Sequence, residues 1–366
     1  MTLTISTISP TELSSPAHLV SRGPLSAAVL LRLSGSSGLD GTDSGDGTGG
    51  TGSASLVAAA REALERASEI RTDDDVQLAL FFLYASSYGS IGRFSPDLEW
   101  DTELIEARRV LEAAFERELR ERIPVPELPE PRADAVAKTL FELTGADTGP
   151  SLAKYFAKRA TLAQSREFLI QRSIYTLREA DPHSWAIPRL RGRPKAALVE
   201  IQSDEYGGGR PERVHAEIFA TSMRAAGLDD TYAAYLDRVP AITLASQNMM
   251  SMFGLNRRLI GAIVGHLAAF EMTSSIPNKL YGDGFRRLGF GDEVTDYFDE
   301  HVEADAVHEQ IAGRDLAGAL AEDRPELLPD IMFGAAACLV VDGEVAGHML
   351  DSWSRDESSL LPVGAR

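Results

Sequence analysis

The stretch HVEADAVHEQ, residues 301–310, is the most informative part of the sequence. An α-helix advances about 100° per residue, so His301, Asp305 and His308 fall within about 60° of one another on a single helical face. Two imidazoles and one carboxylate on one face form half of a metal site, and these ligand types suit iron, manganese or zinc. The stretch therefore predicts a helix that carries part of a metal centre.

A second helix has to supply the other half of such a site. The sequence GRPERVHAEIF places Glu212 three residues before His215. This is the spacing at which helical bundles project a Glu and a His together into a core. Pro211 stands where a first helical turn tolerates proline. An isolated Glu-x-x-His is common by chance, so this pair indicates a metal site only in combination with the His and Asp residues of 301–308.

Three further acidic residues lie in helical stretches. Glu271, in GHLAAFEMTSS, has apolar neighbours that would bury its carboxylate, which is costly unless the charge is paired or metal-bound. Glu179 lies in IYTLREADPHSW. Glu205 precedes Glu212 by seven residues, and the two share a face only if the helix continues through the three glycines between them.

Helical patterns dominate the chain from about Ser55 onward. Apolar residues recur at i, i+3, i+4 and i+7 in SLVAAAREALERASEI, DDDVQLALFFLYASS and DTELIEARRVLEAAFERELRERI, and again after a Pro-rich break at 123–134. Alternating β-branched runs bounded by turn dipeptides hardly occur. We therefore predict an all-α protein.

Composition divides the chain into four parts. Residues 38–54, GLDGTDSGDGTGGTGSA, contain almost nothing to bury, and together with the preceding stretch they predict a flexible, disordered arm over 1–54. We expect an N-terminal helical region over 55–150 that packs on the core. The core itself is expected over 151–355, followed by a tail over 356–366.

Charge and cysteine usage limit the partners and the compartment. The 55 acidic and 36 basic residues give a net charge of −19, which disfavours nucleic acid and anionic membrane surfaces. The single cysteine, Cys338, excludes an intramolecular disulfide and fits a reducing cytoplasm. The sequence shows no signal peptide and no apolar run of transmembrane length. We expect a cytoplasmic protein with a small-molecule substrate and no nucleic-acid or membrane partner.

Taken together, the acidic and histidine residues follow one order along the chain: Glu179, Glu212-x-x-His215, Glu271 and His301-x3-Asp305-x2-His308. This order resembles the ligand pattern of the haem-oxygenase-like diiron oxidases and oxygenases, often described as iron-containing redox enzymes. The phrases DEYGGGRPERVHAEIF, GHLAAFEMTSSIPN and HVEADAVHEQIA carry the resemblance, which runs from about residue 70 to the C-terminal helix. It implies a haem-oxygenase-like helical bundle that binds two irons in place of haem.

The resemblance also implies a role for each matched residue. Glu271 resembles a ligand from a middle helix that can move onto the metal. Glu205 matches a carboxylate that some members use as an additional or alternative ligand. Glu179, Glu212 and Glu271 are implied to take part in catalysis. The implied metal ligands are Glu179, Glu205, Glu212, His215, Glu271, His301, Asp305 and His308.

The implied activity is that of a non-haem diiron enzyme. Two irons per chain, cycling between Fe(II) and Fe(III), would use dioxygen as a co-substrate to oxidise a small organic molecule. Members of the group differ in outcome, which is amine N-oxygenation, oxidative decarboxylation of fatty acids, or cleavage of carbon–carbon or carbon–nitrogen bonds in amino acids. The ligands do not decide between these outcomes, and the sequence leaves open an external electron donor and a homodimer.

Other helical proteins fit the sequence less well. A haem binder of the same fold needs a histidine near the start of the fold, but none lies between His18 and His183. A thiaminase-like hydrolase needs a nucleophilic cysteine, and Cys338 stands in an apolar run. A ferritin-like protein would carry Glu-x-x-His on two helices. The remaining alternative is a protein of the same fold without diiron chemistry, which either binds a metal without catalysis or serves as a helical interaction protein. In the interaction protein the acidic residues would form a solvated face and bind no iron.

Overall fold

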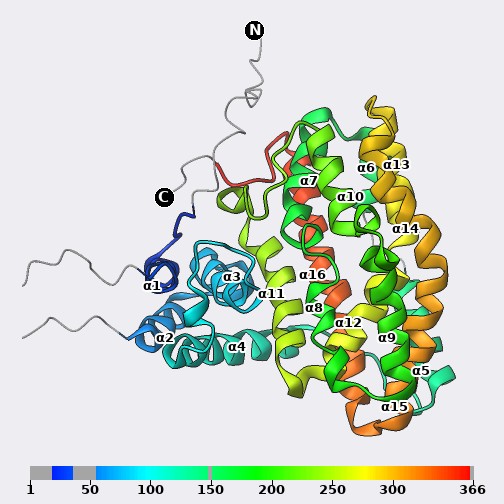
Figure 1. Ribbon diagram of the computed structural model, residues 1–366, viewed down its shortest axis with the longest axis horizontal. Coiled ribbons are helices and arrows are strands. Elements are labelled where there is room, and N and C mark those ends of the chain that lie inside the picture. Colours follow the sequence, from blue (N-terminus) through cyan, green and yellow to red (C-terminus); the bar gives the residue numbers. More distant parts are fainter. Residues whose placement is uncertain (1–18, 36–54, 147–150, 363–366) are drawn as a thin grey trace, which may run out of the picture. The chain divides into compact units, whose positions relative to one another are not determined.

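The computed structural model describes residues 19–35, 55–146 and 151–362, with side chains described everywhere in these ranges except 303–306. Regular structure in the described residues is helical, apart from one isolated antiparallel bridge between Tyr206 and Val214. The prediction of an all-α protein is therefore confirmed. The chain divides into two compact units, which are treated separately below (Figure 1).

The first unit, which we call the N-terminal unit, comprises Leu19–Arg122 and Pro240–Asn248. Within it α1 and α2 pack on α3, and α2 also packs on α4. Helix α3 begins after Asp73, whose carboxylate accepts a hydrogen bond from the Val76 amide 2.9 Å away. The helices are α1 (Pro24–Leu33), α2 (Leu56–Arg66), η2 (Ile70–Thr72), α3 (Asp74–Tyr88), η3 (Pro96–Leu98) and α4 (Thr102–Arg122).

Helix α1 lies inside the stretch that we expected to be a flexible arm. Its Leu25, Val29 and Leu33 are fully buried, because PLSAAVLLRL presents enough apolar surface to pack on a neighbouring helix. The expectation of an arm over 1–54 is therefore corrected for these residues. Most of the other residues of that stretch, including the glycine-rich 38–54, lie outside the described part of the chain.

The second unit, which we call the core unit, comprises Ile123–Val239 and the described residues from Met249 onward. Helix α11 (Ala241–Leu255) contributes residues to both units. The remaining helices are α5 (Ala133–Thr144), α6 (Leu152–Arg159), α7 (Leu162–Thr176), α8 (Asp181–Ser184), η4 (Ile187–Arg189), α9 (Gly192–Glu205), η5 (Gly207–Gly209), η6 (Pro211–Arg213), α10 (His215–Ala225), η7 (Leu236–Arg238), η8 (Arg257–Leu259), α12 (Ile260–Met272), α13 (Ser275–Arg287), α14 (Asp292–Gln310), the π-helix η9 (Ile311–Gly318), α15 (Ala319–Asp323), η10 (Pro325–Leu327) and α16 (Leu328–Ser354).

Helices α12 and α16 form the centre of the core unit and lie side by side in Figure 1. Their backbones approach closely at small residues. A side-chain carbon added at Gly265 would overlap the carbonyl oxygen of Ile331, and one at Gly334 would overlap that of Ala262. Glycine is therefore required at both positions. Around this pair, α14 packs on α10, α12 and α13, while η9 packs on α9 and α5.

Two boundaries differ from those expected. Helix α5, which we placed in the N-terminal region, belongs to the core unit and packs on α12 and η9. The expected C-terminal tail contains two buried residues, Ser359 and Leu360. No single helix among the described residues passes a test of length and apolarity for crossing a membrane. The bent pair Arg257–Met272 and Ser275–Arg287 passes it by length and composition only.

Candidate metal centre

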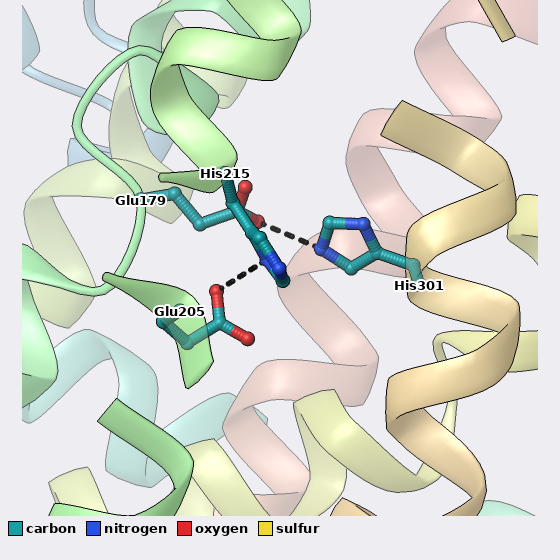
Figure 2. A group of neighbouring side chains, drawn as sticks. All are labelled: Glu179, Glu205, His215 and His301. Atoms are coloured by element: carbon teal, nitrogen blue, oxygen red, sulfur yellow. Dashed lines mark ion pairs between the residues drawn. The ribbon is translucent and has the colours of Figure 1, made fainter. Parts of the chain in front are cut away.

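Six buried side chains from five segments of the core unit converge inside the bundle. They are Glu179 in the turn after α7, Glu205 at the end of α9, His215 at the start of α10, Glu271 near the end of α12, and His301 and His308 on α14. Each side chain is less than a tenth exposed, although three of the six are glutamates, a type that is rarely buried without a partner. Figure 2 shows four of them, with both imidazoles directed at carboxylates.

The run of three glycines brings Glu205 and His215 together. Gly207, Gly208 and Gly209 have φ angles of 76°, 58° and 84°, in the left-handed region that favours glycine. Helix α9 therefore ends at Glu205, and the chain folds back so that α10 begins at His215. A side-chain carbon at Gly207 would lie 2.7 Å from the Val214 nitrogen, so the closure of this loop also requires glycine.

A second local feature directs Glu179 into the cluster. Ala180 has a φ of 70°, which is unusual for a residue other than glycine, and it lies between the end of α7 at Thr176 and the start of α8 at Asp181. Gln202 Nε2 donates a 2.8 Å hydrogen bond to the Ala180 carbonyl oxygen and so holds this turn. Strained backbone of this kind occurs preferentially at functional sites.

Four of the side chains form a first group of ligand atoms. Glu179, Glu205, His215 and His301 each offer one atom within 4.8 Å of all the others. The shortest contacts pair a ring nitrogen with a carboxylate oxygen. His215 Nδ1 lies 3.0 Å from Glu205 Oε2, and His301 Nε2 lies 3.6 Å from Glu179 Oε1 (Figure 2).

A second group consists of Glu205, Glu271 and His308, again with one atom of each within 4.8 Å of the others. His308 Nδ1 lies 3.5 Å from Glu271 Oε2. Glu205 belongs to both groups. The two sets of ligand atoms are therefore adjacent and meet at one carboxylate, which can offer one oxygen to each side.

Hydrogen bonds assign a proton to one nitrogen of each α14 histidine and leave the other nitrogen facing a carboxylate. His301 Nδ1 lies 2.7 Å from the Tyr297 carbonyl oxygen, which can only accept, so Nδ1–H donates and Nε2 keeps its lone pair. His308 Nε2 donates to Asp204 Oδ2 at 3.1 Å and leaves Nδ1 toward Glu271. Such outer hydrogen bonds orient histidines that bind metals.

Among the side chains that the structure describes, two ring nitrogens of the cluster are buried without a hydrogen bond of normal geometry, namely Nδ1 of His215 and Nδ1 of His308. Buried polar atoms are usually satisfied, and leaving one unpaired is unfavourable. Both nitrogens lie against carboxylate oxygens that could coordinate the same cation. Imidazole and carboxylate are the ligand types that iron accepts, so the donor set fits a metal.

The pKa values of the clustered residues also fit a site that binds a cation. Burial raises the pKa of Glu205, but the neighbouring His215 outweighs this and lowers it to about 2. Burial and the charge of Glu205 raise the pKa of Glu271. Burial lowers the pKa of His308, yet the nearby Glu271 carboxylate outweighs it and raises that pKa to about 9. Without a metal, the cluster therefore needs a proton on His308 to balance its buried negative charge.

The structure does not bring every predicted ligand to the cluster. Glu212 is exposed in η6 and belongs to neither group, which corrects the expectation drawn from its spacing to His215. The two residues are not on one helix, because α10 begins only at His215. Asp305 lies on α14, but its side chain is outside the described part of the structure.

Sequence reasoning missed Tyr297, which supports two members of the cluster. Its hydroxyl lies 2.9 Å from each oxygen of Glu179 and donates to that carboxylate, while its carbonyl oxygen accepts from His301. Burial and the charge of Glu179 raise the pKa of Tyr297 well above its ordinary value, so the hydroxyl keeps its proton. Its position four residues before His301, on the same helical face, was the available signal.

Residues 166–343 match the model of a protein family described as iron-containing redox enzyme, and this range includes all six clustered side chains. This segment belongs to the iron-containing redox enzyme family. The expected family and its haem-oxygenase-like fold are thereby confirmed, and the family description indicates an oxidoreductase. The buried Glu and His cluster within this segment is consistent with a metal site. No curated protein matched the chain.

Proposed function

We propose that this protein is a non-haem diiron oxidase or oxygenase that uses dioxygen to oxidise a small organic substrate. The observation that supports it is the sharing of Glu205 between two adjacent groups of ligand atoms. One group of ligand atoms alone would fit a site for a single metal ion. Two groups that meet at one carboxylate favour a pair of ions.

Under this proposal each residue has a defined task. Glu179, His215 and His301 would hold one iron, Glu271 and His308 would hold the other, and Glu205 is within reach of both groups. Two ferrous ions held in this way would supply electrons for the reduction of dioxygen. The three carboxylates carry three negative charges, which offset most of the charge of two divalent cations.

The side chains around the cluster prepare the ligands and limit the access of water. Tyr297 holds Glu179 and His301, and Asp204 holds His308, so these ligands need little rearrangement when a metal binds. Leu267 and Phe270 line the adjacent cavity with apolar surface. An external electron donor would complete the cycle where the substrate does not supply all the electrons.

The deciding experiment is anaerobic Fe(II) titration of the metal-free protein, followed by rapid mixing with dioxygen and optical monitoring. We expect two irons per chain and a transient visible absorption. One iron per chain, or no optical change on mixing, would contradict the proposal.

Two matched variants make this test specific. Glu205→Gln should lower the iron content or abolish the reaction with dioxygen, because the shared carboxylate loses its charge. Glu212→Gln removes an exposed carboxylate from the same loop and should leave both results unchanged. Equal effects of the two substitutions would count against the assigned ligands.

A further inference from the structure

A small cavity lies against the metal cluster and is lined on one side by Glu179, Glu205, Glu271 and His301. Its volume of about 10 Å³ corresponds to roughly one water-sized sphere. Its other polar lining residues are Tyr175, His183, Gln202 and Ser274, and two of them, His183 and Gln202, each have a buried polar atom without a hydrogen-bond partner among the described residues. Neither belongs to the groups of candidate metal ligands, and the proposed function does not use them.

His183 forms a hydrogen bond with a second buried histidine. Its Nε2 lies 3.2 Å from Nδ1 of His266, and the two residues are 1% and 0% exposed. Burial lowers the pKa of His183 to about 4, and burial lowers that of His266 well below its ordinary value. Both rings are therefore neutral at physiological pH, and each carries a single proton.

The outer nitrogens of this pair have no hydrogen-bond partner among the described residues: Nδ1 of His183 and Nε2 of His266. Only one ring can donate across the shared bond. If His183 donates, His266 is left with a buried, unpaired N–H. If His266 donates, the unpaired N–H is on His183 instead, and His266 keeps only an unpaired lone pair. His183 lines the cavity and His266 does not, so only the N–H on His183 can be paired by a group inside the cavity. The second arrangement is favoured, and it gives His183 a proton on Nδ1.

Gln202 offers the complementary group. Its Nε2 donates to the Ala180 carbonyl oxygen and to Ser184 Oγ, both at 2.8 Å. Because a carbonyl oxygen can only accept, the orientation of the amide is fixed. Its Oε1 is then a buried acceptor that has no partner within the described part of the chain. A donor on His183 and an acceptor on Gln202 thus come from two residues that line the same small cavity.

We propose that this cavity contains a subsite for a single hydroxyl group, which donates to Gln202 Oε1 and accepts from His183 Nδ1–H. A hydroxyl satisfies both buried groups at once and matches the size of the cavity. It is supplied either by a water molecule or by a substrate that carries an alcohol. The subsite extends the proposed function, because it would place this hydroxyl beside the metal ligands.

The test uses the full chain labelled with 15N-histidine and loaded with Zn(II), which fills the metal positions without iron chemistry. NMR should show a proton on His183 Nδ1 and a nuclear Overhauser contact between that proton and a bound hydroxyl. The contact should be lost in Gln202→Met. A bare His183 Nδ1 would overturn the proposal, as would a contact that appears without metal and vanishes on Zn(II) loading.

Control variants and a second probe complete the design. Gln171→Met removes a glutamine that is equally buried and whose Nε2 also donates two hydrogen bonds, to Ser359, so it should keep the contact. Titration with methanol distinguishes the two sources of the hydroxyl. Contacts to the methyl protons of methanol indicate that the subsite accepts an organic alcohol, and an unchanged contact indicates water.

The outcome is separable from that of the proposed function. The measurement involves neither iron nor dioxygen, and if no metal binds, spectra of the metal-free protein test the same His183 proton and the same hydroxyl contact. If Gln202→Met does not fold, His266→Phe provides the second test. In this variant His266 no longer donates to His183 Nε2, so His183 is no longer held with its proton on Nδ1. We therefore expect the 15N chemical shifts of His183 to change. Unchanged His183 shifts in that variant would overturn the assigned tautomer.

Discussion

At the scale of single residues, the sequence identified most of the clustered side chains by type and spacing. The i, i+7 spacing of His301 and His308 on one helix was sufficient to place both inside. Glu271 could be identified because its neighbours are apolar. The sequence could not show whether Glu205 or Glu212 joins the cluster. That depends on where the helix ends, which is set by the φ angles of the glycine run. Residues that hydrogen-bond to the ligands, such as Tyr297, are brought there by the packing of helices. The spacing of residues along the sequence predicts such contacts poorly.

Tyr297→Phe is the most direct test of the support around the cluster. The substitution keeps the ring and the carbonyl oxygen that accepts from His301, but it removes the donor to Glu179. Because such outer contacts orient metal ligands, we expect metal affinity to fall about 10- to 100-fold with the fold retained. Anaerobic titration with Fe(II) measures it. Tyr281→Phe, at another buried tyrosine that makes no hydrogen bond to a candidate ligand, should bind as the wild type does.

The raised pKa of His308 predicts a pH dependence of metal binding. A metal must displace the proton on Nδ1, so affinity at the second position should rise about tenfold per pH unit up to about pH 9 and then level off. The stability of the metal-free protein should change in the opposite sense. Because the pKa is raised on folding, the contribution of His308 is complete below about pH 6.5 and is lost as the pH rises through about 9.

Asp204→Asn separates this effect from a general influence of pH. The Asp204 carboxylate accepts from His308 Nε2 and helps to raise its pKa. Without that charge, the pH at which affinity levels off should move down. An unchanged pH profile in isothermal titrations would show that another group controls metal binding.

At the scale of elements, periodicity predicted helices well and predicted their ends poorly. The pattern around His215 was compatible with a helix that began several residues earlier, and the actual start follows from the backbone of Gly207–Gly209. The π-helix η9 (Ile311–Gly318) continues α14 just beyond His308. The wider turn of a π-helix cannot be predicted from the pattern of apolar residues. Such segments occur often at functional sites, which fits its place beside the cluster.

Two alanine substitutions in the glycine run test whether this loop determines the cluster. Both Gly207→Ala and Gly208→Ala place a side chain at positive φ, which costs about 1–2 kcal/mol. At Gly208 the added carbon meets nothing within 4 Å, whereas at Gly207 it meets the backbone of Arg213 and Val214. We expect Gly207→Ala to be the more destabilising in chemical denaturation and also to reduce metal binding. Similar losses in both variants would mean that only the φ angle matters.

At the scale of the whole molecule, the sequence predicted an all-α chain but not which parts of it pack together. Helix α1 lies in a stretch whose average composition suggests disorder, yet ten of its residues form a helix with a buried face. The C-terminal residues were expected to form a tail for the same reason. A few apolar or hydrogen-bonding residues are enough to fix a segment when a complementary surface exists elsewhere. Composition averaged over a segment cannot show such a surface.

The C-terminal segment provides the last test, because one buried carboxylate holds it. Glu167 Oε2 accepts from Trp353 Nε1 at 2.9 Å and from the amide and hydroxyl of Ser359 at 2.8 Å each. Glu167→Ala leaves these buried donors without an acceptor, so we expect the free energy of unfolding to fall by about 1–3 kcal/mol or more. Glu357→Ala, at an exposed carboxylate paired with Arg355, should change it by less than about 0.5 kcal/mol. Equal stabilities of the two variants in urea denaturation would mean that the segment packs without help from Glu167.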